Sequence, residues 1–252
     1  MSIKYAIAAA AIGVASISSG AVAADTPTIV LVHGAWANGS SWSKVIPLLQ
    51  AEGLDVVSVH NPLSSFEADV AATRRVIDDQ AGDVILVGHS YGGAVITEAG
   101  NNDKVKGLVY VAAFAPSAGE SINAIVGAHG QPAWFGEIHA DKGGYLTWSA
   151  KGMAKFFAPD ISPDEAALLA ATQAPLFAGA FDTPIANAAY TQKPSWYVIA
   201  DNDQIIPAVL QDAFAQKMKA TVTHVGASHV AMLSQPQAVA NAILAAVAAS
   251  GE

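Results

Sequence analysis

The pentapeptide Gly88-His89-Ser90-Tyr91-Gly92 restricts the fold of this chain more than any other feature, because a strand-like run passes into a helix-like run there. Before it, residues 83–87 (Asp-Val-Ile-Leu-Val) form a short, β-branched stretch typical of a buried strand. After it, residues 93–99 can continue as a helix up to Gly100. Glycines flanking a G-x-S-x-G turn permit a sharp bend that leaves the serine hydroxyl exposed above the sheet. The pattern predicts a nucleophile elbow with Ser90 as the nucleophile.

Strand-like and helix-like segments alternate on both sides of this turn, which is the pattern of a parallel sheet covered by helices. Strands are expected at 28–33, 54–59, 83–87, 105–112, 195–200 and 221–225, and helices near 42–49, 66–77, 93–99, 208–218 and 239–247. Pro47 would kink the first helix unless it falls in the first turn. The sequence therefore predicts an α/β fold with a mostly parallel sheet flanked by helices.

Residues 116–190 break this alternation. A structureless loop of that length is unusual inside a compact domain, so the segment is interpreted as a mainly helical cap inserted over the sheet. The cap should roof an apolar pocket, with two or three of its aromatic side chains touching substrate and the rest forming its own core. The candidates are Trp134, Phe135, Tyr145, Trp148, Phe156, Phe157 and Phe181. Among them, Trp134 and Trp148 are the predicted pocket residues.

The first 24 residues have the features of a secretory signal peptide. Lys4 supplies a weakly basic start, residues 5–14 are apolar, and residues 21–24 (Ala-Val-Ala-Ala) offer a small-residue cleavage site. Cleavage after Ala24 or after Ala23 would leave a single domain of residues 25–252 in the periplasm or outside the cell. A membrane anchor or a helix of the folded domain is the alternative, but the apolar run is too short to span a bilayer.

Charge and composition exclude several classes of function. The formal net charge of −9 argues against nucleic acid, which is bound mainly through basic patches. The chain has no cysteine, so disulfides, thiolate metal sites and a cysteine nucleophile are excluded. Its histidines show no metal-ligand spacing such as H-E-x-x-H. The sequence predicts neither a metal nor a cofactor, and it predicts no membrane association of the mature chain. It does not indicate the oligomeric state.

An acid and a histidine should complete a catalytic triad with Ser90, each in a loop after a later strand. After the strand-like run 195–200 come two aspartates, of which Asp203 is preferred over Asp201 because it precedes Pro207 in a D-x-x-I-P pattern. Both could instead cap the helix that starts near Pro207. His229 follows the last strand and is preferred over His224, which lies within it.

A tetrahedral intermediate also needs hydrogen-bond donors for its oxygen. The backbone N–H of Tyr91, directly after the nucleophile, should be one donor, and the N–H of Ala35, in the loop after the first strand, should be the other. Trp36 is interpreted as a packing aromatic rather than a substrate contact, and so is Trp42. His89 is interpreted as structural.

Three segments together resemble a small subgroup of α/β-hydrolases that includes plant methyl esterases, hydroxynitrile lyases and bacterial esterase-like proteins. They are residues 30–36 (Val-Leu-Val-His-Gly-Ala-Trp), 88–93 (Gly-His-Ser-Tyr-Gly-Gly) and 226–233 (Gly-Ala-Ser-His-Val-Ala-Met-Leu). The resemblance implies that Phe114 lines the acyl pocket. The lyases typically carry threonine where this chain has Gly34 and lysine where it has Val230, which favours ester hydrolysis. Gly34 is expected to leave room beside Ser90 for an acyl group and for water.

The expected activity is hydrolysis of small, mostly apolar carboxylic esters through an acyl-enzyme, with a small-molecule ester as the binding partner. Two alternatives stay open. The first is a non-catalytic binding protein on a hydrolase scaffold, since a fold does not establish an activity. The second is a hydroxynitrile lyase. The identity of the ester is not specified by the sequence.

Overall fold

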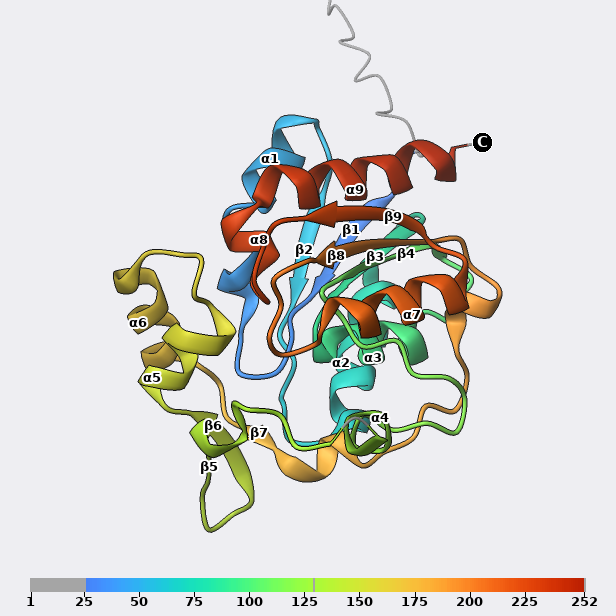
Figure 1. The fold of residues 1–252 in the computed structure, drawn as a ribbon. Helices are drawn as coiled ribbons and strands as arrows, with labels where there is room; N and C mark the ends of the chain where they lie inside the picture. The colour runs from blue at the N-terminus through green and yellow to red at the C-terminus, as the bar shows by residue number, and fades with distance from the viewer. Residues whose placement is uncertain (1–25, 129, 252) are drawn as a thin grey trace, which may run out of the picture.

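Six parallel strands in the order β2-β1-β3-β4-β8-β9 form the central sheet of the computed structural model (Figure 1). The structure describes residues 26–128 and 130–251, so the predicted signal peptide, residues 1–24, lies outside the described residues. The strands are β1 Thr28–Val32, β2 Val56–Val59, β3 Val84–His89, β4 Val105–Val111, β8 Ser195–Ala200 and β9 Thr221–Val225. The predicted mostly parallel α/β fold is confirmed.

Helices cover both faces of this sheet, as the buried, β-branched strands require. In Figure 1, α1 and α9 lie over one face, and α2, α3 and α7 lie over the other. Their bounds are α1 Ile46–Ala51, α2 Phe66–Asp79, α3 Tyr91–Ala99, α7 Ala208–Met218 and α9 Pro236–Ser250, and a short α8, Ala231–Ser234, precedes α9. Pro47 falls in the first turn of α1, where a backbone N–H would have no intrahelical acceptor. The absence of this N–H in proline therefore breaks no helical hydrogen bond. No helix in the described residues is long and apolar enough to cross a bilayer.

The turn between β3 and α3 is tightly packed and strained. Ser90 has φ 53° and ψ −124°, a backbone conformation that non-glycine residues rarely adopt. A Cβ at Gly88 would come within 2.6 Å of the Gly92 carbonyl oxygen, and a Cβ at Gly92 within 2.6 Å of the Val32 carbonyl oxygen. Both contacts are with backbone, which cannot move aside cheaply. The two motif glycines therefore bring α3 close enough to β1 to hold the strained serine in place.

Gly92→Ala is expected to destabilise the protein, although alanine normally favours a helix by about 1 kcal/mol over glycine. Gly92 lies inside α3, and the added methyl group would clash with the Val32 carbonyl, at a cost of about 1–3 kcal/mol or more. Gly82→Ala is the matched control, because a Cβ there meets nothing within 4 Å. Urea unfolding of both variants measures the difference. Equal stability of the two variants would contradict the packing argument.

The cap over residues 116–190 contains helices and, in addition, a small sheet that the sequence did not predict. Its helices are α4 Ile122–Ala128, α5 Ala150–Gly152 and α6 Pro163–Thr172, with a π-helical turn at Met153–Phe157. Its antiparallel strands, in the order β5-β6-β7, are β5 Ile138–Ala140, β6 Tyr145–Trp148 and β7 Leu176–Phe177. Strands this short show no recognisable alternation, so periodicity could not reveal them.

Candidate active site

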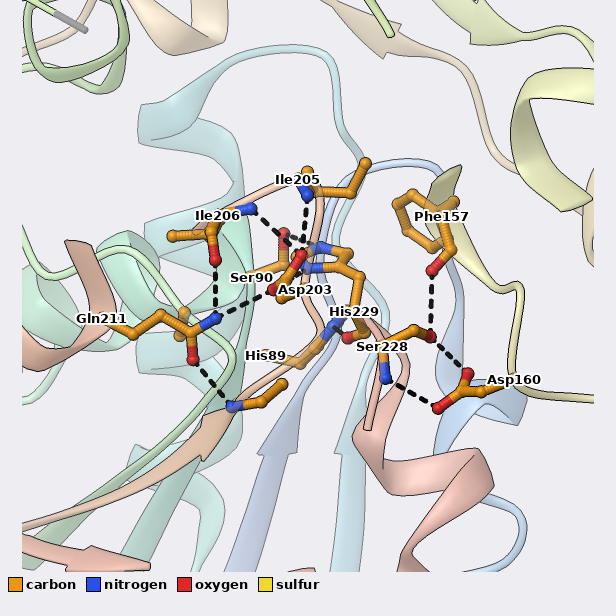
Figure 2. Close-up of polar contacts among 12 residues, drawn as sticks. His89, Ser90, Phe157, Asp160, Asp203, Ile205, Ile206, Gln211, Ser228 and His229 are labelled. Atoms are coloured by element: carbon orange, nitrogen blue, oxygen red, sulfur yellow. Dashed lines mark hydrogen bonds and ion pairs between the residues drawn. The ribbon is translucent and has the colours of Figure 1, made fainter. Parts of the chain in front are cut away.

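Three residues from separate loops meet in a buried hydrogen-bonded chain (Figure 2). Ser90 follows β3, Asp203 follows β8, and His229 follows β9. The Ser90 hydroxyl lies 2.8 Å from Nε2 of His229, and Nδ1 of the same ring lies 2.8 Å from Oδ2 of Asp203. All three side chains are buried. With Nδ1 protonated, His229 can accept the serine proton at Nε2, so the structure brings together the residues that the sequence predicted as nucleophile, base and acid.

Every acceptor position of the Asp203 carboxylate is used. Oδ1 accepts from the backbone N–H groups of Ile205 at 2.7 Å and Ile206 at 3.1 Å. Oδ2 accepts from Nε2 of Gln211 at 3.0 Å in addition to His229. These donors hold the carboxylate in one orientation, so it fixes the tautomer and the angle of the imidazole.

Gln211 was not predicted from the sequence. It is fully buried in α7, and its amide also donates to the Ile206 carbonyl at 2.7 Å and accepts from the Ala200 N–H at 3.0 Å. The only signal for it would have been a polar residue on the otherwise apolar inward face of a helix. Such a residue is common enough that its partner could not have been guessed.

The two rejected candidates pair with each other instead of joining the site. Nδ1 of His224 lies 2.7 Å from Oδ1 of Asp201, and both side chains are about half exposed, at 51% and 43%. This pair lies outside the chain of hydrogen bonds that includes Ser90. The choice of Asp203 and His229 over Asp201 and His224 therefore agrees with the geometry.

His89, within the pentapeptide, supports the backbone of His229. Its Nε2 lies 2.8 Å from the His229 carbonyl oxygen, to which it donates. Complete burial, together with the neighbouring His229, holds the pKa of His89 well below its usual range, so the ring is neutral. His89 thus has the structural role expected for it: it anchors the loop that carries His229.

The two predicted oxyanion donors flank Ser90. Tyr91 is the first residue of α3, where a backbone N–H has no intrahelical acceptor. Ala35 lies in the loop after β1, and both residues line the cavity above Ser90. Within residues 26–128 and 130–251, neither N–H has a hydrogen-bond acceptor. Both donors are therefore free to bind an oxygen at Ser90, as the sequence predicts.

An apolar cavity of about 420 Å³ opens above Ser90, between the sheet and the cap. It is lined by Ala35, Trp36, Ser90, Tyr91, Phe114, Ile122, Asn123, Val126, Gly127, Gly130, Gln131, Pro132, Trp134, Phe135, Ile138, Leu146, Phe181 and Ile205. Among the residues that the structure describes, no charged side chain belongs to this lining. In the described part of the chain, no three histidine, aspartate or glutamate residues are grouped so that they could hold a metal ion.

Phe114 and Trp134 line the cavity as predicted, but Trp148 does not. Trp148 is buried behind the wall, where its ring contacts Trp36 at 5.7 Å and Trp134 at 5.4 Å between centroids. The prediction for Trp148 was wrong because an aromatic residue in a cap can equally well serve as its core. For Trp36 the error is the reverse, because it was interpreted as a packing aromatic and yet it lines the cavity. Its indole N–H donates to the Leu146 carbonyl at 2.9 Å.

The role predicted for Gly34 was also wrong. A Cβ at this position would lie 2.8 Å from Cβ of Ser90 and 3.0 Å from Nδ1 of His89. Gly34 is not part of the cavity lining, so it does not border the space that an acyl group or water would fill. It lets the loop after β1 pack directly against the nucleophile, which places the neighbouring Ala35 N–H beside Ser90.

A buried carboxylate that has no basic partner among the described residues lies behind Tyr91. Oδ2 of Asp69 accepts from the Tyr91 hydroxyl at 2.6 Å, and Oδ1 accepts from the Leu63 N–H at 2.7 Å. Burial raises the pKa of Asp69 to about 6, because desolvation outweighs these two hydrogen bonds. The aspartate thereby fixes the side chain of the residue that supplies one oxyanion donor.

Asp69→Asn is expected to change how stability depends on pH. A carboxyl whose pKa is raised in the folded state stabilises the fold fully below its unfolded pKa, and this contribution is lost as the pH rises through about 6. Relative to Asp69→Asn, the wild type should therefore lose up to about 3 kcal/mol between pH 4 and pH 7. Urea unfolding across this range measures the loss, with the exposed Asp55→Asn as control. A pH-independent difference would contradict it.

Comparison with known proteins agrees with this geometry. A model described as "Alpha/beta hydrolase family" matches residues 29–242. The chain is 32% identical to the "Carbendazim hydrolyzing esterase" of Nocardioides sp., over 38% of this chain and 46% of that protein. It is 29% identical to "Methylesterase 1" of Arabidopsis thaliana, over 52% of this chain and 56% of that protein. It thus spans about half the length of these two curated relatives, which confirm the resemblance to plant methyl esterases and bacterial esterases.

A solved structure shows the same fold. The "Novel Pyrethroid Hydrolase from Sphingobium faniae" superposes with a TM-score of 0.75 at 24% identity, covering 88% of this chain and 98% of that one. The likeness in three dimensions therefore extends over the cap as well as the sheet.

Proposed function

The chain belongs to the alpha/beta hydrolase family, and on that basis we propose that it hydrolyses small, mostly apolar carboxylic esters through an acyl-enzyme. One observation carries this proposal: the Ser90 hydroxyl is 2.8 Å from the Asp203-bound His229 imidazole and opens into a cavity whose described lining residues are all uncharged. The names of the relatives, an esterase and a methylesterase, support the same reaction.

The reaction would proceed in two halves. His229 takes the proton of Ser90 as Oγ attacks the ester carbonyl, and the N–H groups of Ala35 and Tyr91 bind the oxygen that becomes negative. His229 then gives the proton to the leaving alcohol as the ester C–O bond breaks, which leaves an acyl group on Ser90. Water, deprotonated by His229, attacks this acyl-enzyme and releases the carboxylic acid with Ser90 restored.

The cavity defines the substrate class. A volume of about 420 Å³ lies within the range of small-molecule sites. Its walls are mostly aromatic and aliphatic, with the uncharged amides of Asn123 and Gln131, so the described lining has no opposite charge for a second carboxylate or an amine of an ester. We therefore propose neutral esters with an aromatic or branched apolar group, a class compatible with the carbendazim and pyrethroid substrates named for the relatives.

A panel of nitrophenyl and methyl esters tests this proposal. Neutral acyl groups that fill the cavity should raise kcat/KM, whereas an isosteric acyl group with a terminal carboxylate should lower it. A fluorophosphonate should label Ser90 in the folded protein. Tight binding of an ester that survives unhydrolysed, with no labelling of Ser90, would instead identify a binding protein without turnover.

Cyanohydrin cleavage is not expected. Departing cyanide needs a cation near the pocket to stabilise its charge, and the position after the triad histidine holds the buried, uncharged Val230. The position of Gly34 cannot carry a hydroxyl either, because a side chain there would collide with Ser90. Cyanide release from mandelonitrile, measured beside ester hydrolysis by the same preparation, should stay at the buffer blank. Release that is abolished in Ser90→Ala would contradict this.

We further propose that residues 1–24 are a signal peptide and that the mature chain is periplasmic or secreted. Lys4, the apolar run 5–14 and the small residues 21–24 support this proposal. Mass spectrometry of protein exported from a bacterial host should find a chain that begins at Asp25 or Ala24. A soluble cytoplasmic protein that keeps residues 1–24 would contradict it.

A further inference from the structure

A carboxylate from the cap reaches the loop that carries His229 (Figure 2). Asp160 lies just beyond the π-helical turn Met153–Phe157. Its Oδ2 accepts from the backbone N–H of Ser228 at 2.7 Å, and its Oδ1 accepts from the Ser228 hydroxyl. We call this pair of hydrogen bonds the cap clasp. The same cap segment also touches the imidazole, because the Phe157 ring packs edge-on against His229 with centroids 4.8 Å apart.

In the part of the chain that the structure describes, the side chain and N–H of Ser228 are held by the cap alone: by the cap clasp and by a longer contact of 3.5 Å from the hydroxyl to the Phe157 carbonyl. On either side of Ser228, the loop is held by Asn202, whose N–H donates to the Ala227 carbonyl at 3.0 Å, and by His89 on the His229 carbonyl. Within the described residues, the Ser228 N–H has no acceptor other than Asp160. The segment just before the catalytic histidine therefore depends on a residue of the cap.

Burial makes this dependence strong. Ser228 is only 1% exposed, whereas Asp160 lies at the surface. Without the carboxylate, the buried Ser228 N–H would lose its acceptor and the hydroxyl would keep only the Phe157 carbonyl, at 3.5 Å. A buried donor without a partner is costly. The loop can relieve that cost only by shifting toward water, and such a shift would carry the adjacent His229 with it. Hydrogen bonds to a charged acceptor are also stronger than neutral ones, which suits Asp160 to hold the loop.

We propose that Asp160 is a positioning residue that acts through Ser228 to hold the His229 imidazole at hydrogen-bonding distance from Ser90. This inference rests on the proposed function of Ser90 and His229. A general base must lie within about 3 Å of the proton that it takes. Displacement by about 1 Å from a distant change can cost about a hundredfold in rate. The cap thereby contributes to catalysis as well as covering the pocket.

Kinetics of four variants test the cap clasp in the full-length protein with a nitrophenyl ester. Asp160→Ala should lower kcat about ten- to a hundredfold. KM should change by no more than about twofold, because neither Asp160 nor Ser228 lines the cavity. Asp160→Asn should be intermediate, since its single oxygen can replace only one of the two acceptors. Ser228→Ala removes only the hydroxyl and should also be intermediate, while the double variant Asp160→Ala/Ser228→Ala should be no worse than Asp160→Ala.

The control is Asp164→Asn, which removes an exposed cap carboxylate that makes no side-chain hydrogen bond or ion pair within the described residues. It should keep the kcat of the wild type. If Asp160→Ala does not fold, Asp160→Asn and Ser228→Ala decide the question, because each keeps part of the cap clasp. A kcat in these variants equal to that of Asp164→Asn would overturn the proposal.

Hydrogen–deuterium exchange separates this proposal from the proposed function. Amides of residues 226–230 should exchange faster in Asp160→Ala than in the wild type, while exchange in the rest of the sheet stays the same. Absence of ester turnover in the wild type would refute the proposed function alone. Unchanged exchange at residues 226–230 would overturn the positioning role of Asp160 whether or not the protein turns over esters.

Discussion

Ser90→Ala is expected to reduce kcat for ester hydrolysis by at least about a thousandfold, because the residues of a triad act as a unit. Without the Oγ atom, no acyl-enzyme can form, and His229 has no proton to accept. The residual rate would come from the Ala35 and Tyr91 donors and from binding in the cavity. Initial rates with a nitrophenyl ester, over a wide range of enzyme concentration, measure the loss.

The matched control is Ser43→Ala, which removes an exposed hydroxyl at the end of a surface turn. It should leave kcat unchanged. Ser90→Ala should still unfold cooperatively. Alanine is smaller than serine, so it should not destabilise the turn, in which residue 90 has φ 53°. Retention of most of the esterase activity in Ser90→Ala would mean that another residue performs the nucleophilic step.

Asp203→Asn is expected to lower kcat by about 10³- to 10⁴-fold with little change in KM. The carboxylate accepts from donors on both of its oxygens. An asparagine has one acceptor oxygen, so its NH₂ group must face either the two backbone N–H groups or His229 and Gln211. When it faces His229, it favours the tautomer with the proton on Nε2, which cannot take a proton from Ser90. A kcat–pH profile with activated esters measures the loss.

Asp201→Asn is the control, since it makes the same chemical change two residues away. Asp201 pairs with His224 at the surface, and exposed ion pairs contribute little. This variant should keep kcat within about twofold of the wild type. The reverse result, with Asp201→Asn inactive and Asp203→Asn active, would show that the hydrogen-bonded chain in Figure 2 is not the one used in catalysis.

Strong local signals made most of the fold predictable. Buried parallel strands are continuous apolar runs, so β8 begins and ends at the residues that the sequence indicated. The edge strand β9 is mostly exposed, yet its β-branched run also has the predicted bounds. The turn at Ser90 needs glycine at positions 88 and 92, because a side chain there would collide with neighbouring backbone, and few other turns have this requirement. The cap sheet had no such signal, because strands of two to four residues resemble loops. The cap sheet forms by pairing between segments, some of which are far apart in the chain. Between the paired strands β6 and β7 lie the whole of α5 and α6.

By itself, the sequence determined the α/β class, the place of Ser90 at a strained turn, and the chain order of nucleophile, acid and base, because each of these depends on neighbours along the chain. Only the tertiary structure decided which side chains face one another across loops. Gln211 donates to Asp203, and Asp160 accepts from Ser228. Trp148 lies behind the cavity wall, whereas Trp36 is part of that wall. Gly34 packs directly against Ser90. Such contacts join residues far apart in the chain, and no local spacing records them.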